Sequence, residues 1–404
     1  MDMRIKQLVL VLVTTLILLL TPMFSPVVIG VMSIVFTALL YFIFKIRYYS
    51  IAAAVLSLLY AIGFIPVTAF IGPMMMVVWG EAFISAFKKA DHPLGFFFAG
   101  STLALILTVV YLRDTQPLII VLAVLVLLLL RSILKDRQDG SMIALIGVGA
   151  TITLFEDLEF LVDNMTLAVA VVLCIAFGYF AYKAKTVDLS GVFAAVLIGV
   201  ILITFANVMW FFVVLAFFII GSLFTKFKYA LKDKMGVSQS RKGVRGYMNA
   251  FANVGVAVIG AILYGITGEI MFAALFVGSV AVATADTLAS EIGVLGGTPV
   301  MITSFKPCPV GTNGGVTMTG EIACLCGSAF ISLLAYSLGI VPGYVAVICF
   351  LTGIIGTNLD SLVGALIENR GVIGNSGTNF IATASGGLIA LGLTVLCISV
   401  FHFA

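Results

Sequence analysis

Two stretches of the sequence place carboxylates at the end of an apolar segment, beside hydroxyl side chains. Asp286, Ser290 and Glu291 close one such segment, and Asp360 closes another. Magnesium prefers an octahedral shell of oxygens, usually one or two carboxylates together with substrate phosphates and water. Asp286 and Ser290 share a helix face, whereas Glu291 lies further round. We therefore expect Asp286 and Asp360 to hold Mg²⁺ with support from Glu291, although Asp360 taken singly could merely cap a helix.

A glycine-rich segment follows the first of these carboxylates. Lys306 precedes it, and its residues are Gly311, Thr312, Asn313, Gly314 and Gly315. Such a segment can turn sharply and direct backbone N–H groups at a phosphate. It is not a P-loop, because the GxxxxGK[ST] pattern is missing. On its own the segment could be a simple turn, but beside Lys306 and the carboxylates it predicts a phosphate site.

A third polar group stands at the start of another apolar segment. Arg245, Asn249 and Asn253 follow one another at four-residue spacing and so share one helix face. Two carboxamides one turn apart would be costly in lipid unless they face protein, water or a ligand. Arg241 and Arg245 also belong to a basic segment that suits an anionic substrate or anionic lipid headgroups. A basic loop is equally what membrane topology alone would require.

The composition places all of these residues in a membrane protein. Of 404 residues, 62% are hydrophobic and only 10% are charged, against about 45–50% and about 25% in soluble domains. This excludes a water-soluble protein. The six cysteines form no CxxC pair and there are only two histidines, so neither a disulfide framework nor a zinc or haem centre is expected.

The apolar segments predict an all-α polytopic membrane protein. A helix needs about 20 apolar residues to cross the hydrocarbon core. Division at charges, prolines and polar clusters gives 15 segments, so we expect about 15 transmembrane helices. The segments are 7–22, 24–44, 50–66, 68–86, 94–112, 116–134, 141–155, 160–182, 189–206, 208–224, 249–267, 270–287, 321–340, 342–359 and 379–402.

The loop charges predict the orientation. If the N-terminus is cytoplasmic, every lysine and arginine except Arg113 falls on the inner side, and the acidic cluster at 156–163 falls outside. Positive residues are retained at the cytoplasmic face during insertion. The polar segments described above would then lie at the cytoplasmic face. No transit peptide or retention signal is evident, which favours a prokaryotic plasma membrane.

The chain has two unequal parts. Residues 1–180 consist of apolar segments with short loops, and residues 181–404 carry nearly all the polar motifs. Glu81 is the exception in the first part. A carboxylate inside a span can be functional, but hydration or pairing with a nearby lysine is the simpler interpretation. We expect 1–180 to be N-terminal transmembrane helices of unknown role and 181–404 to be a catalytic transmembrane domain.

Five motifs of the second part resemble one integral membrane family. They are Arg245 to Asn253-Val-Gly-Val-Ala, Ala285-Asp-Thr-Leu-Ala-Ser-Glu-Ile-Gly, Pro309-Val-Gly-Thr-Asn-Gly-Gly-Val-Thr, Asp360-Ser-Leu-Val-Gly-Ala and Thr378-Asn-Phe. The plant members of this family are chloroplast phytyl-phosphate kinases of vitamin E synthesis. The family is distantly similar to the CTP-dependent phytol and dolichol kinases. The resemblance covers about 181–404 and gives 1–180 no role.

The resemblance implies a kinase that transfers a phosphoryl group from a nucleoside triphosphate, CTP, to an isoprenyl monophosphate, giving the diphosphate. Its cofactor would be Mg²⁺, and its partners the nucleotide, an isoprenyl-phosphate lipid and the membrane, with no nucleic acid.

The candidate residues divide among these roles. Asp286, Asp360 and Lys306 would be catalytic, with Lys306 and the 311–315 turn on the nucleotide phosphates. Arg241 and Arg245 would meet the isoprenyl phosphate, Asn249 and Asn253 would orient one substrate, and the lipid tail would lie between helices. Two alternatives stay open: a transporter or flippase of an anionic lipid such as an isoprenoid phosphate, and a CTP-dependent lipid cytidylyltransferase.

Overall fold

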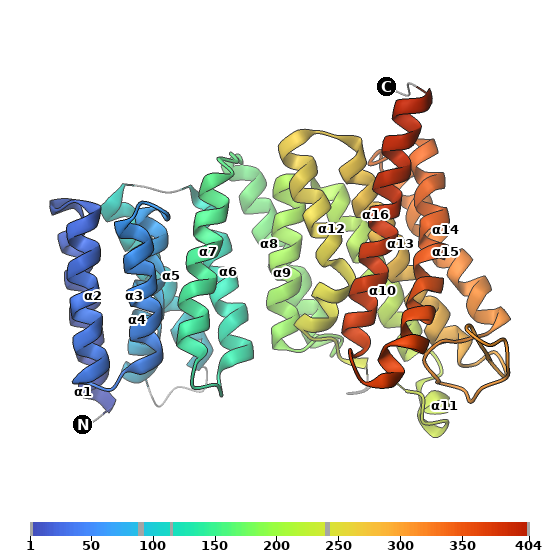
Figure 1. Cartoon of the computed structure of the whole chain (residues 1–404), viewed down its shortest axis with the longest axis horizontal. Helices are drawn as coiled ribbons and strands as arrows, with labels where there is room; N and C mark the ends of the chain where they lie inside the picture. The colour runs from blue at the N-terminus through green and yellow to red at the C-terminus, as the bar shows by residue number, and fades with distance from the viewer. Residues whose placement is uncertain (1–2, 88–92, 114–115, 239–242, 402–404) are drawn as a thin grey trace. The chain divides into compact units, whose positions relative to one another are not determined.

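The computed structural model describes residues 3–87, 93–113, 116–238 and 243–401. These residues form two compact units, Met1–Asn164 and Met165–Ala404 (Figure 1). The first unit holds α1 (Met3–Leu20), α2 (Pro26–Phe42), α3 (Arg47–Ala61), α4 (Val67–Ala86), α5 (Pro93–Leu112), α6 (Pro117–Leu134) and α7 (Gly140–Asp157). The second holds α8 (Asn164–Lys183), α9 (Leu189–Phe205), α10 (Val208–Lys226), α11 (Tyr229–Lys234), α12 (Tyr247–Thr267), α13 (Ile270–Gly293), α14 (Met318–Ser337), α15 (Gly343–Leu366) and α16 (Asn375–Phe401).

The structure confirms the all-α polytopic fold. Each of the predicted apolar segments coincides with one helix. Within the described residues, 12 helices are long and apolar enough to cross a membrane, and α2 and α9 are apolar but shorter. Helix α3 has only 15 residues. The short polar helix α11 is the one α-helix in the described part that no apolar segment predicts.

The first unit is built around α4, which packs against α1, α3, α5 and α7. Its apolar helices are joined by isolated polar contacts, such as the 2.7 Å hydrogen bond between the hydroxyls of Ser33 and Ser57. Glu81 forms a 2.9 Å salt bridge with Arg131 of α6, and the Arg131 guanidinium lies over the Phe97 ring at 5.2 Å. Glu81 is therefore paired, though with an arginine of another helix and not with a lysine nearby in the sequence.

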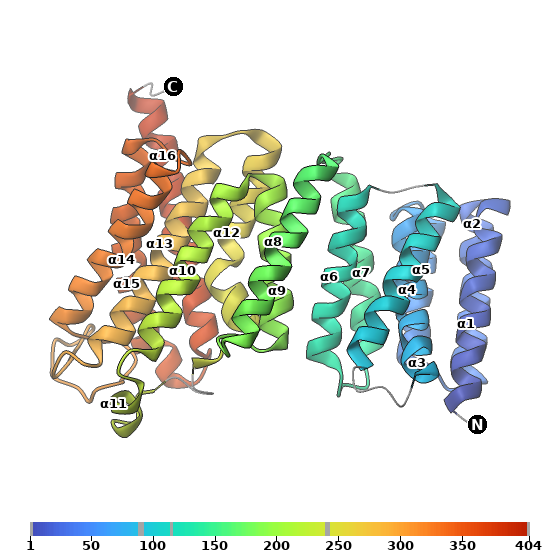
Figure 2. The same cartoon turned by 180° about the vertical axis from the view of Figure 1, so that it is seen from behind.

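The second unit is built around α13, which contacts α10, α12, α14, α15 and α16 (Figures 1 and 2). Small residues bring these helices close together. A side chain at Gly278 would meet Ala390 at 2.7 Å, and one at Gly353 would meet the Ser328 hydroxyl at 2.1 Å. Small residues at such contacts let backbones approach closely in lipid. The close packing makes α13 a rigid support for whatever stands near its C-terminal end.

One end of the second unit collects the polar segments. Helices α10, α13 and α15 end there, and α12, α14 and α16 begin there. Helix α11 and the long connection between α13 and α14 lie at the same end (Figure 2). This connection contains a two-stranded antiparallel sheet of β1 (Val300–Met301) and β2 (Gly315–Val316), with Val300 opposite Val316.

The structure places the division between the units earlier than the expected boundary between residues 180 and 181. Helix α8 belongs to the second unit, because its Phe177 ring packs edge-on against Phe211 at 6.0 Å and against Phe218 at 5.2 Å. A side chain at Gly178 would also meet Val192 of α9 at 3.1 Å. Because α8 is as apolar as the helices before it, composition alone did not distinguish it from them.

Candidate functional site

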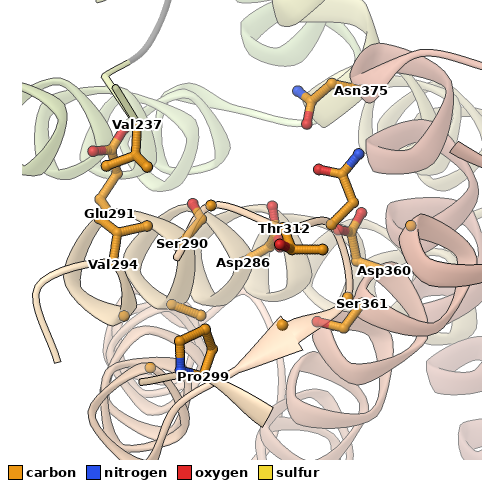
Figure 3. Close-up of a pocket in the computed structure, with 18 of the residues that line it drawn as sticks. Val237, Asp286, Ser290, Glu291, Val294, Pro299, Thr312, Asp360, Ser361 and Asn375 are labelled. Atoms are coloured by element: carbon orange, nitrogen blue, oxygen red, sulfur yellow. The ribbon is translucent and has the colours of Figure 1, made fainter. Parts of the chain in front are cut away.

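A cavity of about 430 Å³ opens at the polar end of the second unit. It is lined by residues of α12, α13, α14, α15 and α16, and by the connecting residues 235–238 and 310–317. We call it the polar cavity. All three polar segments of the sequence contribute to its wall, and Figure 3 shows the side chains of several lining residues.

Asp286 of α13 and Asp360 of α15 meet in this cavity. The two half-buried carboxyl groups line the same cavity and lie close enough to interact electrostatically, and both are labelled in Figure 3. The Oδ1 atom of Asp360 is buried and has no hydrogen-bond partner among the described residues. Two carboxylates at this separation repel each other unless a proton or a cation lies between them. The pair is thus a fitting donor set for a hard cation.

Two further carboxylates stand in the same wall, and the sequence reasoning did not assign them to the site. Glu368 interacts electrostatically with both aspartates and accepts a 2.7 Å hydrogen bond from the Thr378 hydroxyl. Glu321, in the first turn of α14, accepts a 3.4 Å hydrogen bond from the Asn358 amide. Glu368 follows Asp360 at a spacing that places both on one helix face, so the sequence could have assigned Glu368 to the site. Little in the sequence distinguishes Glu321 from a carboxylate outside the site.

Glu291 does not join the aspartate pair. Its carboxylate forms a 2.5 Å salt bridge with the Lys232 ammonium, and the two side chains are only 5% and 1% exposed. Lys232 also donates a 2.8 Å hydrogen bond to the Phe224 carbonyl. Five residues separate Asp286 from Glu291, which turns the two side chains about 140° apart round the helix. In the described part of the chain, no three His, Cys, Asp or Glu side chains form a group that could hold a metal ion.

Arg245 lies at the base of the cavity with only 7% of its surface exposed. Its guanidinium contacts the Phe217 ring at 5.6 Å and lies against Gly221, where a Cβ atom would come within 2.7 Å of it. The Arg245 Nε atom is buried and, as far as the described residues extend, unpartnered. Burial lowers the pKa of Arg245 to about 10, an effect that nearby Glu291 opposes, so the guanidinium is cationic at neutral pH. Arg241 lies outside the described residues.

The two asparagines of α12 face protein and the cavity. Asn249 and Asn253 both line the polar cavity. The Asn253 amide donates to the Asn249 carbonyl at 2.8 Å and accepts from the Asn379 amide of α16 at 3.4 Å. These bonds offset the cost of placing the Asn253 carboxamide near the start of a membrane helix.

The glycine-rich turn 311–315 also lines the cavity and is fixed against α15. Gly314 has a φ of +85°, and a Cβ atom there would meet Ala365 at 2.5 Å and the Ser361 carbonyl at 2.8 Å. The Asn369 amide donates a 3.0 Å hydrogen bond to the Asn313 carbonyl. These contacts hold the turn beside the end of the helix that carries Asp360.

Lys306 is not where the sequence suggested. It is exposed and is not among the residues that line the polar cavity. Its carbonyl accepts a 2.9 Å hydrogen bond from the Met301 N–H, so its backbone is held against β1. Lys306 is thus close to the turn 311–315 in sequence but does not line the cavity.

The charges of the polar cavity are strongly unbalanced. Among the described lining residues, the acidic side chains are Asp286, Glu291, Glu321, Asp360 and Glu368, and the one basic side chain is Arg245. Lys232 neutralises Glu291 from outside the lining. The remaining carboxylates would repel a phosphate group that entered alone. An anionic substrate therefore needs cations to bind here.

The residues that line the polar cavity lie in a region of the chain that matches a known family. Residues 172–387 match a family described as Integral membrane protein DUF92. The chain belongs to this family. The match takes in every helix of the polar cavity and lies entirely within the second unit. The predicted family resemblance is thereby confirmed.

Several relatives align with the same region. An uncharacterized membrane protein of Methanocaldococcus jannaschii is 33% identical over 219 residues, which are 53% of this chain and 88% of the relative. An uncharacterized membrane protein of Synechocystis is 31% identical over 186 residues, 45% of this chain and 72% of the relative. The chloroplastic protein VTE6 of Arabidopsis thaliana is 31% identical over 211 residues, 50% of this chain and 63% of VTE6. No solved structure matches the chain.

Proposed function

We propose that this protein is a membrane kinase that transfers a phosphoryl group from a nucleoside triphosphate, CTP, to an isoprenyl monophosphate, giving the diphosphate. The observation that carries the proposal is the Asp286–Asp360 pair in an acidic cavity at the ends of membrane helices. Phosphoryl transfer needs positioning and charge neutralisation more than covalent catalysis. Similarity to VTE6 supports the same chemistry, because the plant members of the family that this chain resembles are phytyl-phosphate kinases.

Asp286 and Asp360 would hold Mg²⁺, since two carboxylates with phosphate and water oxygens satisfy its preference. The bound ion would neutralise the nucleotide phosphates and the charge that develops during transfer. Glu368 strengthens the negative field that attracts the ion. Glu291 is held by Lys232 and therefore supports the wall instead of the metal.

The anionic groups would bind where helices begin. The N-terminal ends of α12, α14 and α16 lie at the cavity, and helix N-termini favour negative charge. The turn 311–315 would contact the nucleotide phosphates, and Arg245 would bind the phosphate of the lipid. This acceptor phosphate is already anionic, so no strong general base is needed. Lys306 has no role in this proposal, because it stands outside the cavity.

The distribution of charge in the second unit favours an enzyme over a transporter. Within its described residues, charged side chains gather at the end that holds the polar cavity, and Glu269 is the exception at the other end. A transporter of anionic lipids would need access for a charged headgroup from both faces of the membrane. The single-ended arrangement suits a reaction at one surface.

The test is a transfer assay with the purified full-length protein in lipid nanodiscs. CTP or ATP labelled at the γ-phosphate is supplied with isoprenyl monophosphates and Mg²⁺. The proposal expects a labelled isoprenyl diphosphate and the nucleoside diphosphate. A CDP-linked lipid with release of pyrophosphate would show a cytidylyltransferase instead. Movement of the lipid between leaflets without turnover would show a transporter.

A further inference from the structure

A second cavity of the same unit is apolar and adjoins the polar cavity. It lies between α8, α9, α10 and α12 and has a volume of about 60 Å³. We call it the apolar cavity. Gly191, Ala195 and Gly199 follow one another at four-residue spacing along α9 and form a floor of small residues. Phe177, Phe211 and Phe218 provide an aromatic wall opposite this floor.

The two cavities meet at a polar junction. Arg245 and Asn249 belong to the lining of both. The buried Nε atom of Arg245 has no hydrogen-bond partner in the described part of the protein, and an unpaired buried donor costs free energy until a ligand or water satisfies it. The junction therefore offers a cation for an anionic headgroup at the point where the wall changes from polar to hydrocarbon.

We propose that the apolar cavity binds the hydrocarbon tail of the lipid whose phosphate group Arg245 holds. This inference rests on the proposed function and names the place of its lipid substrate. The stretch of α9 from Gly191 to Leu202 lines the cavity and is about 16 Å long at the helical rise per residue. The phosphate at Arg245 then lies in the same cavity as the aspartate pair, while the first isoprene units lie along the small residues of α9.

The apolar cavity as it stands is small, at about 60 Å³. A tail needs more room, and the half-buried Phe218 ring at its side would turn aside to admit it from the bilayer. Substrate selection by chain length follows, because each isoprene unit adds contacts along the floor until the chain passes Leu202.

The inference is tested by filling the cavity. Ala195→Leu on α9 and Ala250→Leu on α12 add bulk to its lining. Ala216→Leu is the matched control, because Ala216 is on α10 but does not line the apolar cavity. In nanodiscs, transfer to geranylgeranyl phosphate is compared with transfer to dimethylallyl phosphate. Each cavity variant should lose at least about tenfold more kcat/KM with the long substrate than with the short one. The control should keep the wild-type ratio. An unchanged ratio in the cavity variants overturns the inference.

A second measurement separates this inference from the kinase proposal. Geranylgeranyl phosphate with a photoactivatable tail is cross-linked to the full-length protein without nucleotide, and labelled peptides are identified by mass spectrometry. We expect label on α8, α9, α10 or α12 and a loss of at least about tenfold in Ala195→Leu. Such labelling without any transfer activity would retain the tail site and reject the kinase. Label elsewhere, label indifferent to Ala195→Leu, or equal labelling by a photoactivatable phosphatidylcholine would reject the tail site.

Discussion

At the scale of single residues, the proposed phosphoryl transfer depends on two carboxylates that would share one cation. Asp286 and Asp360 come from different helices yet line the same cavity and interact electrostatically. Neither has a lysine or arginine partner among the described residues. A buried pair of like charges is destabilising without a proton or cation between them. The presence of such a pair at the polar end of a membrane domain is the reason we propose cation binding, and not packing, as the use of these side chains.

Replacing either aspartate by asparagine tests this use. Asp286→Asn and Asp360→Asn keep the side-chain volume but remove a metal ligand, and each should lower kcat by about 100-fold or more. Neither variant should have a lower thermal unfolding temperature as the apoprotein, because removing one of the two carboxylates removes the electrostatic repulsion between them. The γ-phosphate transfer assay measures the first effect and thermal unfolding in detergent the second.

The matched control for these variants is Glu269→Gln, which changes an exposed carboxylate at the opposite end of the helix that carries Asp286. Its activity should equal that of the wild type. Full activity in both aspartate variants would contradict the metal assignment.

The residues also show how far sequence reasoning reaches. Asp286 and Asp360 could be predicted because carboxylates at the ends of apolar segments need a reason to be there. The separation of Glu291 from them depends on its rotation about α13 and on a buried partner, Lys232, which the sequence presents as one lysine among many in a basic loop. The exposure of Lys306 depends on the path of the connection between α13 and α14. No hydrophobic periodicity in the sequence predicts the small sheet in this connection.

At the scale of elements, the polar cavity is made by helix ends of both kinds. The C-terminal ends of α13 and α15 stand near the aspartates, and the N-terminal ends of α12, α14 and α16 line the same space. Helix N-termini favour anions within about one turn, whereas the proposed cation site depends on the aspartate side chains, which lie nearly two turns before the ends of their helices. One cavity can therefore bind a metal ion and phosphates together. The apolar segments predicted the helices, but only their packing around α13 shows which ends meet.

The Lys232–Glu291 salt bridge attaches α11 to α13, and its removal should destabilise the packing of α11 on α13. Lys232→Met leaves the Glu291 charge buried without its partner, so the free energy of unfolding should fall by about 3–5 kcal/mol. Lys232→Met combined with Glu291→Leu should regain most of this loss, because no uncompensated charge is left. Denaturant unfolding in mixed micelles measures both. Equal destabilisation by the single and the double variant would refute this role for the ion pair.

The glycine-rich turn offers a second test at this scale. Gly314→Ala imposes both backbone strain at φ +85° and a clash with Ala365, so the turn must shift away from α15. We expect KM for the nucleotide to rise by about tenfold or more, since misplacing a positioning group weakens binding and alignment.

Gly297→Ala controls for the strain alone. Gly297 lies in the same connection with a φ of +100°, but a Cβ atom there meets nothing within 4 Å. This variant should leave KM near the wild-type value. A similar rise in KM for both variants would show that strain in the connection, and not contact of the turn with α15, explains the effect.

At the scale of the whole molecule, the features on which the proposed function depends are distributed unequally between the two units. The polar cavity, the apolar cavity and the match to the DUF92 family all lie in the second unit. The relative from Methanocaldococcus jannaschii has 88% of its own length in the aligned region, so a membrane protein with little beyond that region exists. The first unit brings its own helices, whose charged side chains include the Glu81–Arg131 pair.

A chain that begins at Met165 should therefore insert, fold and transfer phosphate. We expect its kcat/KM to lie within about threefold of the full-length value, since every lining residue of both cavities is retained. The comparison uses both proteins in nanodiscs of the same lipid. Loss of activity in a shortened chain that still elutes as a monodisperse, heat-stable species would assign the first unit a part in the reaction.

Metal binding by Asp286 and Asp360 can be measured directly. Mn²⁺ replaces Mg²⁺ as a paramagnetic probe, and its electron paramagnetic resonance spectrum is recorded with the full-length protein and a non-hydrolysable CTP analogue. The wild type and Glu269→Gln should bind a Mn²⁺ ion that Mg²⁺ displaces, and this binding should be lost when Asp286 and Asp360 are both replaced by asparagine. Undiminished Mn²⁺ binding by that double variant would contradict the account.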